Sequence, residues 1–234
     1  MSTYQESTYR SRSLIKRWLH QRRFDETLKT LNLKTSDLLL DYGCGDGYLL
    51  KLCSKSISSQ NLYGFEPANN MYEEAIQNVG KKIKIVQDLK ELNKKFTKIS
   101  CLETCEHLID DDLKILLINI ENLLESNGQV IISVPIEIGI PAMLKNLFRF
   151  FKNKNYDNLT FKNYINTIFG LTVPRNTNQK LSNVDYIYSH IGFDHRKFEL
   201  LLNDYFRIQR KYYSPTNFFR SELNNTTYYI CGKK

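Results

Sequence analysis

Residues 38–50, LLLDYGCGDGYLL, place three glycines within five positions, at Gly43, Gly45 and Gly47. The whole chain of 234 residues has only 10 glycines, so three within five positions indicate a specific structural requirement. Asp41 ends the apolar run before them, and a second apolar segment follows. A glycine-rich turn between a strand and a helix lets the backbone approach a ligand, and the helix N-terminus adds partial positive charge. Because no G-K-[ST] follows, the spacing excludes a P-loop and predicts another kind of ligand-binding loop.

Strand-like apolar runs and helix-length segments alternate outward from this loop. The predicted helices cover residues 47–56, 68–80 and 110–128. Gly80 and Gly128 are the predicted helix stops, and Asp110 is the predicted N-cap. The predicted strands cover residues 37–43, 61–67, 81–89, 98–107, 129–135, 206–214 and 226–234. Alternation at this spacing favours an α/β fold with right-handed crossovers and a parallel sheet covered on both faces.

Composition narrows the class of protein. The net charge of +8 favours an anionic partner, either a phosphorylated substrate, an anionic lipid or nucleic acid, unless it is only a solvated lysine-rich surface. The five cysteines are odd in number and form no C-x-x-C, which is typical of reduced thiols in a cytoplasmic protein. No apolar run approaches 18 residues, and the polar N-terminus does not read as a secretory signal. We therefore expect one domain in the cytoplasm.

An acidic residue, Glu66, ends the second predicted strand about 20 residues after the glycine loop. A carboxylate at this point can accept hydrogen bonds from both hydroxyls of a ribose. In an open α/β sheet the ligand lies at the carboxyl ends of the strands, where the loop and Glu66 both fall. The sequence therefore predicts a nucleoside-containing cofactor.

Five segments in order resemble class I S-adenosylmethionine (SAM)-dependent methyltransferases: LLDYGCGDGYLL, GFEP, VQDL, SCLETCEHL and SNGQVIISVP. The resemblance covers roughly residues 36–135, with fainter similarity at 186–204 and in the last strands. It implies a Rossmann-like, doubly wound, seven-stranded sheet, mostly parallel with an antiparallel last strand, under a helical cap. It further implies a single methyltransferase domain over 1–234, with cap helices in 1–34 and a helical insert or lid in 136–185.

The resemblance also assigns residues to SAM. The glycines and Cys44 would line its methionine and ribose portions, Asp41 would help to bind its amino group, and Glu66 would accept from its ribose. Around the adenine the resemblance places Asp88, the backbone of Leu89, Pro67 and Met71. Asp41 could instead only cap the turn, and Asp88 only the next helix.

The segment CLETCEHL carries Glu103, Glu106 and His107. Its E-x-x-E-H pattern resembles quinone-biosynthesis O-methyltransferases and small-RNA 2′-O-methyltransferases, some of which hold a divalent metal with these three residues and a later histidine. His190 stands at the place that resembles that histidine, with His195 nearby. Two carboxylates and an imidazole suit a divalent cation, and their spacing would place all three on one helical turn.

Two other interpretations of this segment stay open. The motif could cap the following helix, with Glu103 and Thr104 in contact with SAM. Alternatively, His107 could act as a general base, with Glu106 beside it as a second catalytic residue.

The insert after the fifth strand starts a helix near Pro141. Its apolar residues share one helical face, namely Ile140, Met143, Leu144, Leu147, Phe148 and Phe151. Lys145, Arg149 and Lys152 fall on the other face. This pattern predicts either a lid packed on the core or, over 138–152, a helix lying on an anionic membrane surface.

The N-terminal segment predicts one or two further helices. Four apolar residues would pack down, namely Leu14, Ile15, Trp18 and Leu19. Three basic residues would face out, namely Arg17, Arg22 and Arg23.

These observations together predict a SAM-dependent methyltransferase that acts on an oxygen or nitrogen of a small acceptor, lipid-like or a sugar. The cofactor would supply the reactivity and the protein would supply position and desolvation. An RNA 2′-O-methyltransferase is the alternative, although the basic residues are scattered and no RNA-binding module is recognised. A non-enzymatic nucleotide-binding or interaction protein is a third interpretation.

Overall fold

The computed structural model describes residues 13–151, 158–175, 180–181, 184–216 and 221–234. The chain divides into two compact units. The first unit holds residues 1–101 and 123–131, and the second holds residues 102–122 and 132–234. Two strands, β4 (Phe96–Leu102) and β5 (Leu124–Pro135), run from one unit into the other.

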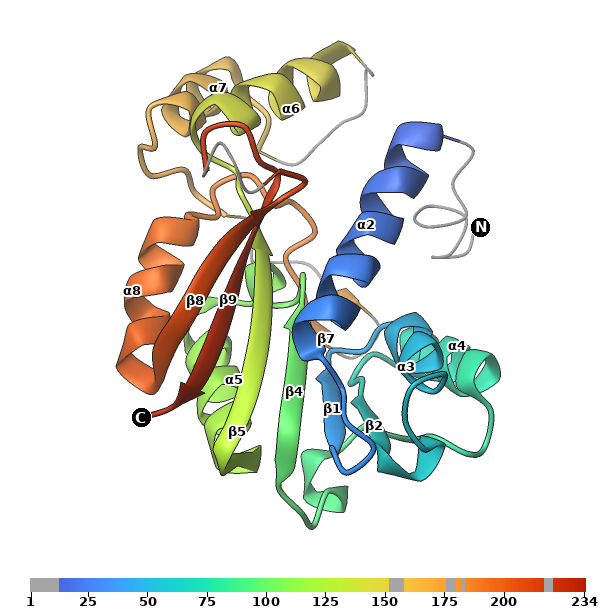
Figure 1. The fold of residues 1–234 in the computed structure, drawn as a ribbon. Coiled ribbons are helices and arrows are strands. Elements are labelled where there is room, and N and C mark those ends of the chain that lie inside the picture. The colour runs from blue at the N-terminus through green and yellow to red at the C-terminus, as the bar shows by residue number, and fades with distance from the viewer. Residues whose placement is uncertain (1–12, 152–157, 176–179, 182–183, 217–220) are drawn as a thin grey trace. The chain divides into compact units, whose positions relative to one another are not determined.

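The central feature is a seven-stranded sheet with the order β3-β2-β1-β4-β5-β9-β8 (Figure 1). Its remaining strands are β1 (Leu39–Tyr42), β2 (Leu62–Phe65), β3 (Lys84–Val86), β8 (Phe206–Ser214) and β9 (Thr226–Lys233). β1 is parallel to β2 and to β4, and β2 is parallel to β3. β9 is antiparallel to β8. The predicted Rossmann-like sheet, with an antiparallel last strand, is confirmed.

In the first unit, β1 is buried along its whole length, as expected for a central parallel strand covered on both faces. Helices α3 (Tyr48–Cys53) and α4 (Asn69–Val79) follow β1 and β2, with the short 3₁₀ turn η1 (Ser59–Asn61) between them. Gly80 ends α4 with a left-handed φ of 70°, so the predicted stop is confirmed. A second 3₁₀ turn, η2 (Leu89–Glu91), follows β3.

The N-terminal helix α2 (Leu14–Leu31) is one continuous helix (Figure 1). Its later turns bury Thr27 and Leu31, whereas Leu14 is 69% exposed and Trp18 49% exposed. The prediction that Leu14 and Trp18 pack down is therefore wrong, because this helix is anchored through its C-terminal turns. The side chain of Ile15 and residues 1–12 of the expected cap lie outside the described residues.

In the second unit, α5 (Asp110–Leu123) buries Leu113, Leu116, Leu117 and Ile120 on one face, as its periodicity predicts. Two details of its ends differ from expectation. The Leu113 N–H donates to the Ile109 carbonyl, so Asp110 is the first helical residue and not the cap.

The helix also ends five residues before Gly128, which lies inside β5. A Cβ on Gly128 would lie 2.7 Å from Leu124 Cδ1, so this glycine permits a close approach of side chain to backbone and does not stop a helix. The prediction of Gly128 as a helix stop is therefore wrong.

The rest of the second unit consists of α6 (Gly139–Phe151), α7 (Phe161–Ile168), α8 (His195–Tyr205) and the 3₁₀ turn η3 (Cys105–His107). Strands β6 (Lys180–Leu181) and β7 (Val184–Asp185) form a separate short ladder that the sequence did not predict. α8 packs on the antiparallel pair through Phe198 and Tyr229, whose ring centroids lie 5.9 Å apart. The side chain of Phe151 and residue Lys152 of the insert lie outside the described residues.

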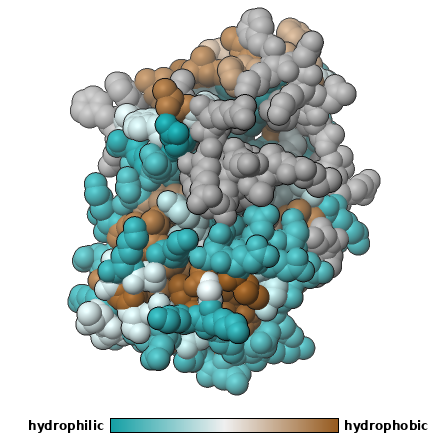
Figure 2. Space-filling view, turned by 90° about the vertical axis from the view of Figure 1, so that its right-hand side faces the viewer, coloured by the Kyte–Doolittle hydropathy of each residue, from teal (hydrophilic) through white to brown (hydrophobic). Residues whose placement is uncertain are grey.

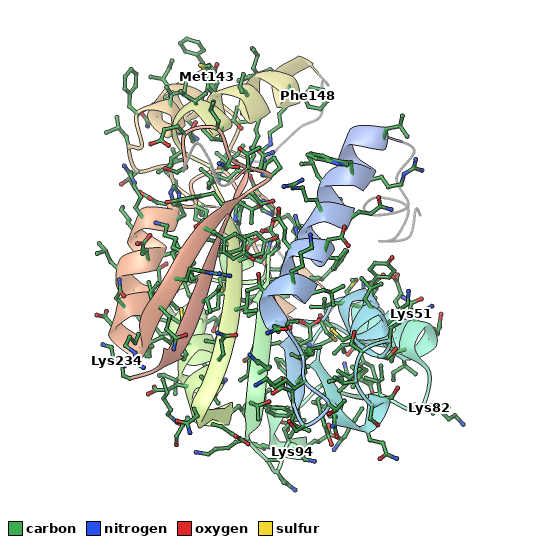
Figure 3. The ribbon with its side chains drawn as sticks, in the orientation of Figure 1. Lys51, Lys82, Lys94, Met143, Phe148 and Lys234 are labelled. Carbon is green, nitrogen blue, oxygen red and sulfur yellow. The ribbon has the colours of Figure 1, made fainter. Side chains whose placement is uncertain are left out.

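Helix α6 turns its basic residues inward and exposes its apolar residues, the reverse of the usual amphipathic arrangement. Lys145 and Arg149 turn inward to Glu137, which is only 1% exposed. The apolar residues Ile140, Leu144, Leu147 and Phe148 are exposed. Hydrophobic surface accordingly appears at the top of Figure 2, the level of α6 and α7, and Figure 3 labels Met143 and Phe148 there. The cations and the apolar residues lie on opposite faces, as predicted, but the apolar face does not pack on the core as a lid would, because the buried carboxylate of Glu137 draws both cations inward.

Candidate functional site

The glycine loop follows β1 in the first unit. Its three glycines all have left-handed φ angles, 74° at Gly43, 55° at Gly45 and 73° at Gly47. A Cβ on Gly47 would lie 2.8 Å from Val79 Cγ1, so a larger residue there would have to displace the Val79 side chain and adopt a strained φ. The N–H groups of Gly43 and Cys44 donate to the Phe65 carbonyl at 2.8 and 3.0 Å. The loop is thus held tightly between the end of β2 and the start of α3.

Glu66 joins this loop to the end of β2. One carboxylate oxygen accepts from the Gly45 N–H at 2.9 Å, and the other accepts from the Ala68 N–H at 3.0 Å. Burial raises the pKa of Glu66 to about 7, although the two backbone hydrogen bonds oppose this rise. The acid that the sequence assigns to ribose recognition therefore lies directly against the glycine loop.

Two further buried carboxylates lie near Glu66. Asp41 accepts from the Ser100 hydroxyl at 2.7 Å, and burial raises its pKa to about 7, with smaller contributions from the charges of Glu66 and Asp46. Asp46 is buried inside the loop and accepts from the Tyr48 N–H at 3.2 Å. Asp46 was not predicted from the sequence, because its position between two glycines carries no pattern that marks it as a site residue. Three acids so close together favour a positively charged ligand, which would stabilise their ionised forms.

The other residues assigned to the cofactor surround the same loop or follow β3. Met71 reaches to 3.6 Å from where a Gly45 Cβ would stand, so it faces the loop. Cys44 is buried and burial raises the pKa of its thiol, so the thiol is neutral. Asp88 is exposed and caps η2 by accepting from the Lys90 N–H at 2.9 Å. Pro67 precedes α4, and Leu89 begins η2.

In the second unit, Glu103 stands apart from the turn that follows it. It has a left-handed φ of 50°, its N–H donates to the Ser133 carbonyl at 3.0 Å, and its carboxylate accepts from the Ser133 hydroxyl at 3.4 Å. Thr104 donates through its hydroxyl to the Leu102 carbonyl at 3.1 Å. Only residues 105–107 form the helical turn, so the expectation that Glu103, Glu106 and His107 share one turn is wrong.

The structure instead gathers Glu106, His107 and His190, whose candidate ligand atoms lie within 4.8 Å of one another. Neither Glu103 nor His195 belongs to this group. His107 Nδ1 lies 2.8 Å from the Ile187 carbonyl, which can only accept, so Nδ1 carries the proton and Nε2 keeps its lone pair. Nε2 in turn lies 3.9 Å from a Glu106 carboxylate oxygen.

Both imidazoles of the cluster are neutral near pH 7. Burial lowers the pKa of His107 to about 4, with a further decrease from the charge of Arg175. Burial also lowers the pKa of His190 to about 3, and repulsion from His107 adds to this effect. A buried carboxylate beside two neutral imidazoles is a donor set that divalent cations accept, and the Nδ1–H···O=C contact is the usual outer support of a ligating histidine.

Arg175 is a neighbour of this cluster that the sequence analysis missed. Its guanidinium donates to the backbone carbonyls of Glu106 and Leu108. It also interacts electrostatically with Glu106, which brings a fixed positive charge to the cluster. An arginine in a long insert has no local pattern that would reveal such a contact.

Comparison with known proteins agrees with this geometry. A family model described as "methyltransferase domain" matches residues 10–166. A comparison with curated proteins finds no significant match. No helix among the described residues is long and apolar enough to cross a membrane.

Three solved structures illustrate the likeness in fold. Magnesium protoporphyrin IX methyltransferase from Synechocystis PCC 6803, with bound S-adenosylhomocysteine (SAH), is 16% identical with a TM-score of 0.58 and covers 96% of this chain and 89% of its own. A SAM-dependent methyltransferase from Clostridium acetobutylicum ATCC 824 is 17% identical with a TM-score of 0.59, covering 98% and 96%. The N-methyltransferase NodS from Bradyrhizobium japonicum WM9, also with SAH, is 10% identical with a TM-score of 0.57, covering 92% and 87%. At these identities the likeness shows the fold alone.

Proposed function

This chain belongs to the class I SAM-dependent methyltransferases, and from that premise we propose that it transfers a methyl group to an oxygen or nitrogen of a small acceptor, lipid-like or a sugar. The observation that carries the proposal is the glycine loop with its three buried carboxylates, Asp41, Asp46 and Glu66. Bound SAM supplies an electrophilic methyl group on a positively charged sulfur. The buried carboxylates suit such a cation, and the absence of Cβ atoms at the three glycines lets a ligand approach the backbone of the loop.

Each predicted cofactor residue has a defined task in this proposal. Glu66 binds the ribose hydroxyls, and Asp41 binds the amino group of the methionine portion. Met71, Pro67, Asp88 and the Leu89 backbone surround the adenine. Glu103 and Thr104, which directly follow β4 in the chain, are retained as further cofactor contacts. The protein would then act mainly by position and by exclusion of water, as expected where the cofactor carries the reactivity.

For the acceptor we propose that Glu106, His107 and His190 hold a divalent cation. Their donor atoms lie close enough together, and the Ile187 carbonyl orients His107 with its Nε2 lone pair free. The cation would orient an acceptor and lower the pKa of its hydroxyl. Glu103 is not part of this proposed site, because the group whose ligand atoms lie close together contains only Glu106, His107 and His190 among the described residues. Without a cation, His107 Nε2 is the group that would accept the acceptor's proton, with Glu106 beside it.

The decisive experiment is calorimetric titration of the purified protein with SAM. Glu66→Gln removes one charge from the loop and should weaken binding roughly tenfold to a hundredfold, the range for a charge-assisted hydrogen bond. Glu73→Gln is the matched control, because Glu73 is exposed on the adjoining α4. An absence of SAM affinity in the unsubstituted protein would contradict the proposal.

RNA 2′-O-methylation is the second candidate, favoured by the net charge of +8 and by the E-x-x-E-H segment. Short RNA substrates with free 3′ ends, assayed for methyl incorporation beside small hydroxylated lipids and sugars, separate the two candidates. Incorporation into RNA alone would replace the small-molecule proposal.

Helix α6 supports one further part of the proposal, a contact with an anionic lipid surface. Its exposed row of Leu144, Leu147 and Ile140 would enter the interface, and the excess of basic residues would favour anionic lipid. The protein would then work in the cytoplasm, at the periphery of a membrane.

A further inference from the structure

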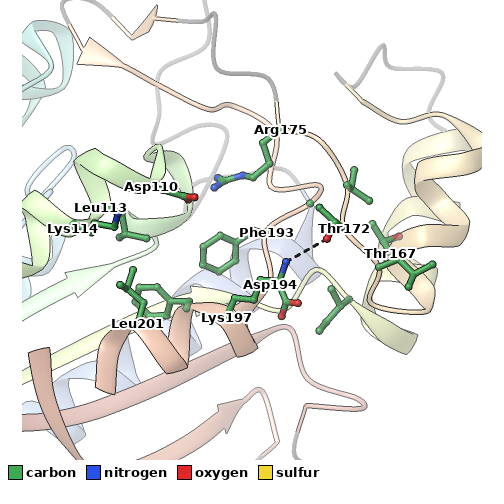
Figure 4. Close-up of a pocket in the computed structure, with 15 residues that line it drawn as sticks. Asp110, Leu113, Lys114, Thr167, Thr172, Arg175, Phe193, Asp194, Lys197 and Leu201 are labelled. Atoms are coloured by element: carbon green, nitrogen blue, oxygen red, sulfur yellow. Dashed lines mark hydrogen bonds between the residues drawn. The ribbon is translucent and has the colours of Figure 1, made fainter. Parts of the chain in front are cut away.

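A cavity of about 370 Å³ in the second unit is not used by the function proposed above. It lies between the start of α5, the start of α8 and the segment 171–175 (Figure 4). Cavities of this size hold small organic molecules. Its walls combine charged and polar side chains with apolar ones, which include Leu113, Phe193, Phe198 and Leu201.

Arg175 gives this cavity its polar character. Two of its nitrogens are occupied by the Glu106 and Leu108 carbonyls, and its guanidinium lies 5.4 Å from the centre of the Phe193 ring. The remaining Nε is buried and has no hydrogen-bond partner among the described residues. Because Nε is enclosed by protein, the guanidinium would act on a molecule in the cavity through its positive charge.

The other charged residues of the lining leave a cationic balance. The Lys197 ammonium donates to the Thr172 hydroxyl at 3.4 Å (Figure 4). Lys114 is paired with Asp111, and Asp194 is paired with Arg196 while it caps α8. Asp110 is exposed and acts on Arg175 only as a charge in its vicinity. The lining holds three cationic side chains, Lys114, Arg175 and Lys197, against two carboxylates, Asp110 and Asp194, and so carries a net positive charge.

We propose that this cavity binds a small organic anion with an apolar body. The anionic group would interact with the positive charges of Arg175 and Lys197, while the apolar body would pack on Phe193, Phe198 and Leu201. The inference does not rest on methyl transfer, since it concerns only residues of the second unit. It does place the ligand beside Glu106, because Arg175 contacts both the cavity and the Glu106 backbone.

The test uses two fluorescent probes with one ring system, anilinonaphthalene sulfonate and its uncharged analogue phenylnaphthylamine, titrated into the full-length protein without SAM. The sulfonate should bind at least about tenfold more tightly than the neutral probe. Leu201→Asp should weaken sulfonate binding by a further factor of about ten relative to Leu201→Asn, which has the same shape without the charge. Arg175→Gln should abolish the preference for the sulfonate, and Arg207→Gln, an exposed cation outside the cavity, should preserve it.

Thermal melts identify any variant that fails to fold. The comparison of Leu201→Asp with Leu201→Asn tests the cavity without removing the hydrogen bonds that Arg175 makes to the protein backbone. Equal affinity for the two probes would overturn the proposal. Equal sulfonate affinity in Leu201→Asp and Leu201→Asn would overturn it as well, because the probe would then bind elsewhere. Neither result would bear on SAM affinity, so this proposal and the proposed function can fail separately.

Discussion

At the scale of single residues, the cofactor loop depends on carboxylates held where water is scarce. Glu66 accepts from two backbone N–H groups, and Asp41 accepts from Ser100, yet burial still raises both pKa values to about 7. Their ionised forms are therefore costly in the protein without a ligand. This stored cost makes the site responsive to a cationic ligand and to pH.

The contribution of Glu66 to the free energy of unfolding should therefore decrease as the pH rises. Its pKa is 4.5 when unfolded and about 7 when folded, so the contribution is fully present below pH 4.5 and is lost as pH rises toward 7. The loss should reach roughly 3 kcal/mol. Urea unfolding of the protein and of Glu66→Gln, from pH 4.5 to 8, measures it as a widening difference that favours the variant. The difference isolates Glu66 from the histidines, whose lowered pKa values act in the opposite direction. A difference that stays constant with pH would contradict this assignment.

The cluster of Glu106, His107 and His190 should bind a divalent cation. Cobalt(II) is a suitable probe, because ligation by nitrogen and oxygen changes its visible absorption. Glu106→Gln and His190→Gln should each weaken cobalt binding by at least about tenfold, the scale seen when a metal site loses supporting groups. His20→Gln serves as the control, since His20 lies on α2 in the other unit. Unchanged cobalt affinity in both cluster variants would contradict the metal site. Glu106 would then serve as the electrostatic partner of Arg175, and His107 would act as a general base without a metal.

At the scale of elements, α6 shows how one buried acid determines the orientation of a helix. Burial alone would raise the pKa of Glu137, but the charges of Lys145 and Arg149 lower it to about 2. The three groups form a compact ionic cluster, with nitrogen–oxygen distances of 3.0 and 2.9 Å. Since the cations occupy the inner face, the apolar residues of α6 are left on the outer face, and this gives the surface proposed for lipid.

Leu144→Asp and Leu147→Asp should each reduce co-sedimentation with vesicles of phosphatidylglycerol by roughly tenfold. Transfer of a leucine side chain from water contributes about 1.5–3 kcal/mol, and an added negative charge opposes anionic lipid. Ile115→Asp is the matched control, because Ile115 on α5 is equally exposed, at 55% against 55% for Leu144. SAM affinity should stay unchanged in all three. Equal sedimentation of the variants and the control would contradict a lipid contact through α6.

At the scale of the whole molecule, the seven-stranded sheet was predictable because each strand has a recognisable local sequence pattern. The central runs are almost wholly apolar, and each is followed by a segment of helical length. The predicted boundaries of the helices and strands agreed less well with the structure. The stretch 124–128 reads as the end of a helix, yet it forms the first part of β5, because Leu124 packs in the core and Gly128 fits over it. Local propensity is overridden in this way wherever burial contributes more.

The sequence by itself determined the glycine loop, Glu66 and the α/β order of the chain. These features depend on short-range demands, namely left-handed φ angles that favour glycine and apolar runs of strand length. The tertiary structure alone decided which distant residues meet. Arg175 reaches Glu106 across 69 positions of the chain, and Glu137 turns the cations of α6 inward. Such contacts depend on how a long insert packs, and a buried charge selects that packing from many with the same local pattern, because leaving it unpaired would cost several kcal/mol.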